Sequence, residues 1–279
     1  MLSLVILPAD ETLPTRPDFS QPDVNVWSSP EGLLCAFSHS QDERHWLHWP
    51  GVASFSFSAG SEAVTAVPYV PPRYDLIKTT FHHSVLPLVL QALGREGLHS
   101  SGVLTPKGVV GFCGKAHTGK STLAYAMSRR GFPLWSDDAL VWEKEGAGFR
   151  AVGLPFEPKL RPPALSFFGH GSLAEVQGSR AEASERTAPL AAVCVLTRTT
   201  PDSGESPISI RRLTGGRALT TLLDHAHCFS PYNVVRTRQM MLSYLSLLDR
   251  VPIFEVRFEP SLSRIFQLVD AIVESVVER

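Results

Sequence analysis

The chain has 279 residues, of which 43% are hydrophobic and 19% charged, and its formal net charge is −1. This balance allows a sizeable buried core and excludes global disorder. Because no basic excess provides a general field for nucleic acid, any anion site must be local, and we expect no nucleic-acid partner.

The cysteines and the apolar segments predict a cytoplasmic protein. Cys35, Cys113, Cys194 and Cys228 show no C-x-x-C spacing, which indicates reduced thiols. Residues 1–8 are apolar without a preceding basic region and predict a strand, not a signal peptide. No apolar stretch approaches the roughly 20 residues that a membrane-spanning helix needs, so we expect no membrane partner.

Residues 1–72 predict a β-rich N-terminal region. Short apolar runs at 24–27, 32–37, 46–49 and 52–57 are separated by turn residues. The proline-rich stretch 67–72 predicts a linker, so we place a second domain at 73–279. Two roles remain open for the N-terminal region, a substrate-docking or lid module and a cap that only adds stability.

The second domain opens with a predicted helix over 74–95. Its apolar residues form a broad face, and Pro87 should kink the helix unless a new one starts there. A predicted hairpin follows, with strands at 102–104 and 109–112 flanking Pro106-Lys-Gly108.

Strands and helices then mix to the C-terminus. Helices are predicted at 121–130 (closed by Gly131), 216–224, 235–250 and 262–277, and strands at 132–135, 139–142, 190–196, 208–212 and 251–258. Residues 143–148 predict a polar turn, and residues 170–188 a mobile surface loop. The pattern predicts an α/β fold.

Residues 114–121 read Gly-Lys-Ala-His-Thr-Gly-Lys-Ser, which is a complete phosphate-binding P-loop. Glycines let backbone amides turn toward phosphate oxygens, the lysine reaches the β- and γ-phosphates, and the hydroxyl holds Mg²⁺. The pattern arises by chance in roughly one chain of this length in a hundred. A strand before it and a helix after it sharpen the prediction. The predicted nucleotide-binding residues here are Gly114, Lys115, Ala116, His117, Thr118, Gly119, Lys120, Ser121 and Thr122.

Asp137 and Asp138 lie 17 and 18 residues after Lys120, at the end of the next predicted strand. A strand–helix–strand unit of this length usually places its second strand near the first in a parallel sheet, which would bring the carboxylates to the P-loop. One carboxylate could bind Mg²⁺, and the other could accept a proton from an attacking hydroxyl. The alternative is a solvated Ser-Asp-Asp turn.

Further candidates are less specific. His99 precedes the hairpin and is either structural or catalytic. Arg161, with Lys159, could neutralise phosphate charge or form a solvated basic loop, and Arg211, Arg212 and Arg217 are looser candidates. Asp224-His-Ala-His227 could belong to a metal site or a triad, but a helix end is favoured.

The run from Leu98 to Leu140 resembles the catalytic domain of HPr kinase/phosphorylase. It is more similar still to the HPr kinase-like proteins of peptide natural-product clusters, including lasso-peptide clusters. The resemblance is strong over about 97–142 and diffuse beyond it.

This resemblance implies a P-loop on a mixed sheet related to phosphoenolpyruvate carboxykinases, and phosphate transfer from a nucleotide to a serine hydroxyl. It assigns the P-loop roles to Lys120 and Ser121, the acid/base role to Asp138, and a catalytic histidine to His99. From the oxygen ligands that Mg²⁺ prefers, we expect Ser121 and Asp137 to share one Mg²⁺, directly or through water.

Two features depart from the family. His117 stands where a third glycine is usual, and Pro-Lys-Leu-Arg-Pro162 replaces the Arg-Gly-Leu-Gly signature. HPr itself and the reverse reaction are therefore not implied.

The sequence thus predicts an ATP- and Mg²⁺-dependent kinase, with a serine of a peptide or small protein as acceptor. The alternatives are a small-molecule kinase on the same fold and a nucleotide-binding regulatory module without transfer activity. Homo-oligomer formation is open.

Overall fold

The computed structural model describes residues 2–9, 17–18, 20–21, 24–29, 31–41, 44–58, 60–156, 160–169, 187–200, 206–227 and 233–278. Contacts divide the chain into two compact units. The first comprises Met1–Gly94 with Cys228–Gln239, and the second Arg95–His227 with Met240–Arg279. This division places residues 73–94 with the N-terminal sheet, whereas the sequence analysis placed them with the second domain. The role of the N-terminal region stays a prediction.

The described strands of the first unit form a six-stranded sheet with the order β1-β6-β5-β4-β3-β2. They are β1 (Ser3–Ile6), β2 (Asn25–Ser28), β3 (Leu34–Gln41), β4 (Arg44–Trp49), β5 (Ala53–Ser58) and β6 (Ala63–Pro68). β1 and β6 pair in parallel and the other neighbours antiparallel. The five strands expected before residue 58 are confirmed.

Strand β6 corrects the expected linker at 67–72. Val67 and Pro68 end this strand, and both are buried beside β5. Proline is tolerated at a strand end because few ladder donors are lost there. The proline-rich connection is therefore shorter than predicted.

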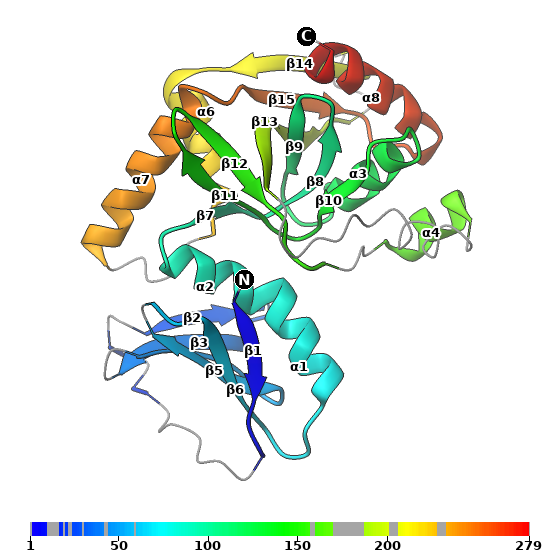
Figure 1. Cartoon of the computed structure of the whole chain (residues 1–279). Helices are drawn as coiled ribbons and strands as arrows, with labels where there is room; N and C mark the ends of the chain where they lie inside the picture. The colour runs from blue at the N-terminus through cyan, green and yellow to red at the C-terminus, as the bar shows by residue number, and fades with distance from the viewer. Residues whose placement is uncertain are drawn as a thin grey trace. The chain divides into compact units, whose positions relative to one another are not determined.

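A helical segment follows, comprising α1 (Tyr74–Thr80), the π-helical turn η1 (Phe81–Val85) and α2 (Leu86–Ala92), as Figure 1 shows. The predicted helix over 74–95 is confirmed up to Ala92. Pro87 has no N–H to donate into the preceding turn, and the helix widens into η1 just before it.

The strands of the second unit form a mixed sheet with the path β10-β8-β9-β13-β12-β11-β7, and β15 and β14 extend it from β13. They are β7 (Glu96–Leu98), β8 (Ser100–Thr105), β9 (Gly108–Cys113), β10 (Leu134–Ser136), β11 (Leu140–Glu145), β12 (Gly148–Val152), β13 (Thr187–Arg198), β14 (Ile208–Leu213) and β15 (Ile253–Phe258). β13 lies parallel to both β9 and β15. The mixed α/β architecture agrees with the prediction.

The helices of this part are α3 (Lys120–Ser128), α4 (Pro162–Phe168), α6 (Gly215–Leu223), α7 (Val234–Leu248) and α8 (Ile265–Ile272). The short helices η4 (Leu262–Arg264) and η5 (Val273–Val277) flank α8. α7 begins in the first unit and ends in the second.

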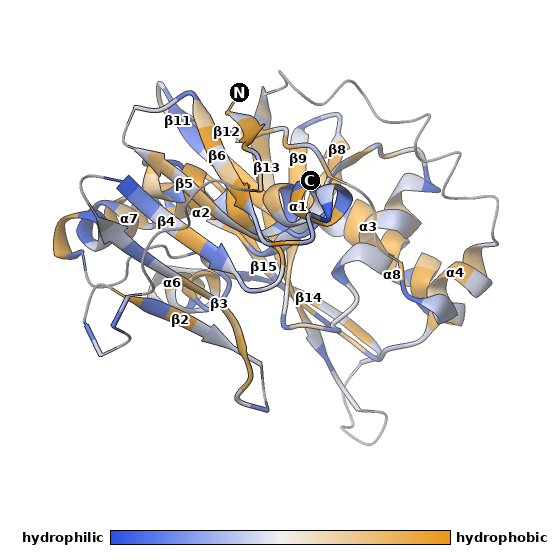
Figure 2. Cartoon of the chain, turned by 90° about the horizontal axis from the view of Figure 1, so that it is seen from below, coloured by the Kyte–Doolittle hydropathy of each residue, from blue (hydrophilic) through white to orange (hydrophobic). Residues whose placement is uncertain are grey.

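The core of the second unit lies where α3 and α8 pack on the sheet. Phe112, Leu123, Met127, Val256 and Leu268 belong to one buried cluster. Figure 2 shows hydrophobic (orange) residues along β9 and α3. Since both strand and helix are anchored in this core, the loop between them has fixed ends.

Most predicted elements of the second unit are confirmed, including the 102–112 hairpin and the helix end at Gly131, where φ is +91°. β7, β12 and α4 were not predicted from the sequence. Residues 143–148 are strand up to Glu145 rather than a polar turn throughout. Of the surface loop expected at 170–188, Thr187 and Ala188 begin β13 and the rest lies outside the described residues, as do Lys159 and Cys228.

Two other expectations concern the chemistry of the chain as a whole. In the part that the structure describes, no helix is long and apolar enough to cross a bilayer. Cys35, Cys113 and Cys194 are free thiols, as predicted for them.

Candidate functional site

The P-loop connects β9 to α3, and its glycines are required by the local geometry. Gly114 has φ +157°, and a Cβ there would lie 3.2 Å from both the Leu196 carbonyl oxygen and the Thr118 side chain. Gly119 caps α3 with φ +109°. Thr118 closes the loop on Lys115 through its amide, 3.1 Å, and its hydroxyl, 2.6 Å, both donating to the same carbonyl. The helix N-terminus thus faces the loop, as in an anion site.

His117 occupies a left-handed backbone conformation, with φ +68°. This conformation costs an ordinary L-residue roughly 1–2 kcal/mol and is normally taken by glycine. His117 therefore keeps the loop in a backbone conformation that usually needs glycine. The imidazole contacts the Arg161 guanidinium, with Nη2 3.1 Å from Nε2.

Lys120 is buried at the start of α3, with 7% of its surface exposed. Its Nζ donates hydrogen bonds to the carbonyl oxygens of Gly114, 2.9 Å, and Lys115, 3.4 Å. Burial lowers the pKa of Lys120, and Cys113, Asp138 and Asp137 oppose this shift. The ammonium group is held inside the loop by the loop's own backbone.

Asp137 is buried beside the first turn of α3. Its Oδ1 accepts hydrogen bonds from the hydroxyls of Ser121, 2.8 Å, and Ser101, 2.6 Å. A hydroxyl and a carboxylate at this distance are hard oxygen donors that suit Mg²⁺. The residues present therefore fit the metal site that the sequence predicts.

The route by which Asp137 reaches the P-loop differs from the prediction. β10 pairs antiparallel with β8 and is not the neighbour of β9, because the β8–β9 hairpin places β8 between them. Two antiparallel pairings in succession leave β10 running in the same direction as β9. Both strands therefore end at the same edge of the sheet, and the predicted meeting of Asp137 and the P-loop occurs.

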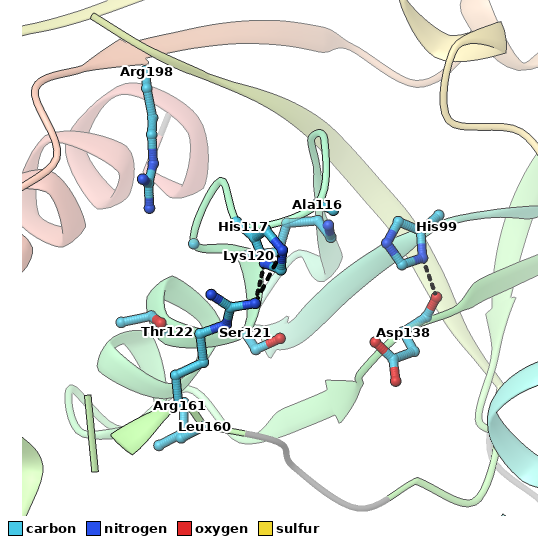
Figure 3. A pocket seen from close by; sticks show the side chains of 11 residues that line it. His99, Ala116, His117, Lys120, Ser121, Thr122, Asp138, Leu160, Arg161 and Arg198 are labelled. Carbon is cyan, nitrogen blue, oxygen red and sulfur yellow. Dashed lines mark hydrogen bonds between the residues drawn. The ribbon is translucent and has the colours of Figure 1, made fainter. Parts of the chain in front are cut away.

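Asp138 also has a left-handed backbone, with φ +66°, and its amide donates to Oδ1 of Asp137 at 3.2 Å. Figure 3 shows its carboxylate pointing into the space in front of Ser121. The two adjacent carboxylates therefore differ: Asp137 is tied to serines and Asp138 lines a cavity.

His99 lies directly after β7, and its Nδ1 donates to the carbonyl oxygen of Asp138 at 3.1 Å. Since a carbonyl only accepts, Nδ1 carries the proton in the neutral ring and Nε2 remains an acceptor. Burial, and next the charge of Lys120, lower the pKa of His99, while Asp138 and Asp137 oppose the shift. The imidazole is therefore biased toward its neutral form.

These groups surround a cavity of about 460 Å³, shown in Figure 3. Its lining comprises His99, Ala116, His117, Gly119, Lys120, Ser121, Thr122, Asp138, Leu160, Arg161 and Arg198. The structure thus brings the P-loop, Asp138, His99 and Arg161 together. Asp137 is bonded to Ser121 but is not among the lining residues, and Arg211 and Arg217 instead bind Glu255.

Arg198 is the site residue that sequence reasoning missed. It ends β13, and its Nε donates to the Thr118 carbonyl oxygen at 3.1 Å. The available signal was a cation at the end of a buried strand, where parallel strands of α/β sheets present functional groups. The missing information was that β13 is the neighbour of β9.

A second cavity, of about 450 Å³, also borders the P-loop. It shares Ala116, His117 and Arg198 with the first, and adds Lys115, Thr118, Val195, Leu196, Thr197, Thr221, Asp224 and His225. Asp224 caps the C-terminus of α6, which confirms the helix end favoured for this segment.

The segment after Asp224 is tied to β7. Ala226 forms an antiparallel bridge with Leu98, and the His99 amide donates to the His225 carbonyl oxygen at 2.7 Å. His225 therefore lies opposite His99 across this bridge. Within the ranges that the structure describes, no group of three or more His, Cys, Asp or Glu residues could hold a metal ion, so the metal-site alternative for 224–227 has no support there.

Comparison with known proteins adds little to this geometry. No family model and no curated protein matches the sequence. Among solved structures, the HPr(Ser) kinase/phosphatase from Coxiella burnetii is similar, with a TM-score of 0.35 and 14% identity over 65% of this chain and 97% of that one. A similarity of this degree carries no functional argument, so function has to be argued from the site.

Proposed function

We propose that this protein is an ATP- and Mg²⁺-dependent kinase that transfers the γ-phosphate to a hydroxyl group. The observation that carries this proposal is the Ser121–Asp137 hydrogen bond, 2.8 Å, beside a P-loop lysine. It unites a phosphate-binding element with a carboxylate from a different strand, a combination that phosphoryl transfer requires.

Each group has a separate task in the proposed reaction. The loop amides and Lys120 would bind the β- and γ-phosphates, and Ser121 and Asp137 would hold Mg²⁺, which would supply charge neutralisation. Asp138 accepts the proton of the acceptor hydroxyl as its oxygen bonds to phosphorus and the bond to the ADP oxygen breaks. ADP leaves with that electron pair. His99 positions Asp138 through the carbonyl that it binds.

A serine of a peptide or small protein is the proposed acceptor, as the sequence resemblance implies. In-line transfer requires the acceptor to approach from the side opposite ADP. The second cavity adjoins His99 through His225 and offers room for side chains next to the serine. That cavity carries two cations, Lys115 and Arg198, beside the carboxylate of Asp224, so its charge is mixed.

The test is transfer of labelled γ-phosphate from ATP to a degenerate serine-peptide library and, in parallel, to a panel of small alcohols. Labelled serine peptides, with the labelling lost in Lys120→Ala, support the proposal. Labelling of small alcohols alone supports a small-molecule kinase. ATP binding without any product supports a regulatory module.

A further inference from the structure

Arg198 reaches the P-loop because of the strand order. Val195 of β13 is the partner of Cys113, the last residue of β9, in a parallel pairing. Three residues further on, Arg198 lies beyond the carboxyl end of β9, where the P-loop takes over. The close approach of the Leu196 carbonyl to Gly114 shows that this end of β13 supports the loop.

Nε of the Arg198 guanidinium is held by a hydrogen bond, and Nη2 lies near the P-loop residue Gly119. Nε donates to the Thr118 carbonyl oxygen at 3.1 Å, and Nη2 comes within 3.9 Å of where a Cβ on Gly119 would lie. Figure 3 shows the group pointing toward the loop. Arg198 lines both cavities, one of them together with Lys120, Ser121 and Thr122.

Among the described residues no salt bridge to Arg198 is formed, whereas Arg130, Arg150, Arg211 and Arg264 each bind an acidic side chain. A guanidinium beside a P-loop, anchored at Nε and carrying further N–H donors, is suited to a phosphate group.

We propose that Arg198 binds the phosphate chain of the nucleotide, with its bond to Thr118 fixing the direction of the guanidinium fork. The inference rests on the proposed nucleotide-binding function and adds to it a residue from outside the P-loop motif. A lysine supplies the positive charge but has no guanidinium that could bond Thr118 and phosphate together. Arg198→Lys should therefore bind the nucleotide less tightly than wild type but more tightly than Arg198→Gln.

The test measures binding rather than turnover. Dissociation constants for ATP, inorganic tripolyphosphate and adenosine are determined by competition against a fluorescent ATP analogue or by calorimetry. The proteins are wild type, Arg198→Gln, Arg198→Lys and the control Arg264→Gln, which removes an arginine bound to Glu259 instead. Thermal unfolding without ligand verifies that each variant is folded.

Arg198→Gln should raise the dissociation constants of ATP and tripolyphosphate roughly 10- to 100-fold, since a charged hydrogen bond to phosphate is lost. The dissociation constant of adenosine should stay within about twofold of wild type. The inference is overturned if Arg198→Gln binds tripolyphosphate like wild type, or if adenosine weakens equally, which would indicate a purely structural role. If wild type binds tripolyphosphate through Arg198 but no nucleotide, the proposed kinase fails and the phosphate contact stands.

Discussion

The Ser121 hydroxyl donates a hydrogen bond of 2.8 Å to Oδ1 of Asp137. Ser121 lies in the first turn of α3, and Asp137 directly follows β10. Ser101 of β8 donates to the same oxygen at 2.6 Å and lies between the two strands that end at the site. Three elements separated in sequence thus fix the position of one carboxylate oxygen. Hydrogen bonds that orient a metal ligand contribute strongly to the affinity for the metal.

Asp137→Asn should therefore raise the Mg²⁺ concentration that gives half-maximal transfer, by about 10- to 100-fold. The neutral amide keeps the shape but removes the charge that attracts the ion. Ser101→Ala leaves the ligand in place and removes one of its two serine bonds, so its effect should be smaller. An Mg²⁺ titration of activity measures both, and an unchanged requirement in Asp137→Asn would exclude Asp137 from the metal site.

Lys120→Ala should abolish transfer, with a loss of at least about 100-fold in kcat, and weaken ATP binding, because a buried positive charge next to the phosphates is removed. Lys107→Ala is the matched control, since Lys107 lies exposed in the β8–β9 turn. Full turnover by a folded Lys120→Ala protein would refute the P-loop assignment.

Asp138→Asn should bind MgATP almost as well as wild type and lose transfer by about 100-fold or more, because an amide cannot accept the hydroxyl proton. Folding should be little affected, since asparagine is among the residues that tolerate the left-handed conformation at this position.

Single-turnover transfer and ATP binding, measured on the same preparation, separate the two effects of Asp138→Asn. The roles of the carboxylates would be reversed if Asp138→Asn transferred phosphate normally while Asp137→Asn stayed inactive at saturating Mg²⁺.

His48 should make the folded state sensitive to acid. Burial and, secondarily, His39 lower the pKa of His48 from 6.5 to about 4. Its ring is stacked on Phe37 at 4.4 Å and bonded to Ser54 at 2.7 Å. Because the unfolded chain takes up the proton first, this stability is present above pH 6.5 and is lost as the pH falls toward 4.

Between pH 7.5 and pH 5 the His48 contribution to the loss amounts to about 2 kcal/mol of unfolding free energy. In His48→Gln, where residue 48 has no titrating group, the unfolding free energy should fall less over the same pH interval. Urea unfolding followed by tryptophan fluorescence gives both values. An equal loss in the two proteins would assign the acid sensitivity to other groups.

The P-loop could be predicted from the sequence because its chemistry depends on local spacing, and residues 114–121 contain all of it. That Asp137 lies close to the P-loop could also be predicted. The strand order that brings it there could not, since β8, which belongs to the hairpin before the motif, lies between β9 and β10. Arg198 could not be found this way. Its partner Thr118 lies 80 residues away, and their contact depends on which strands are neighbours in the sheet.

The bonds from Lys120 to the Gly114 and Lys115 carbonyls have a consequence for ligand choice. The ammonium group has three N–H donors and directs two of them at these carbonyl oxygens, so one donor remains for a ligand while both loop bonds are kept. A neutral ligand offers the group nothing that the carbonyls do not supply, whereas a polyphosphate brings full negative charge and a stronger, charge-assisted bond. If the proposed nucleotide binding holds, Nζ should therefore bind a polyphosphate in preference to a neutral ligand, while the loop carbonyls keep the ammonium group in position.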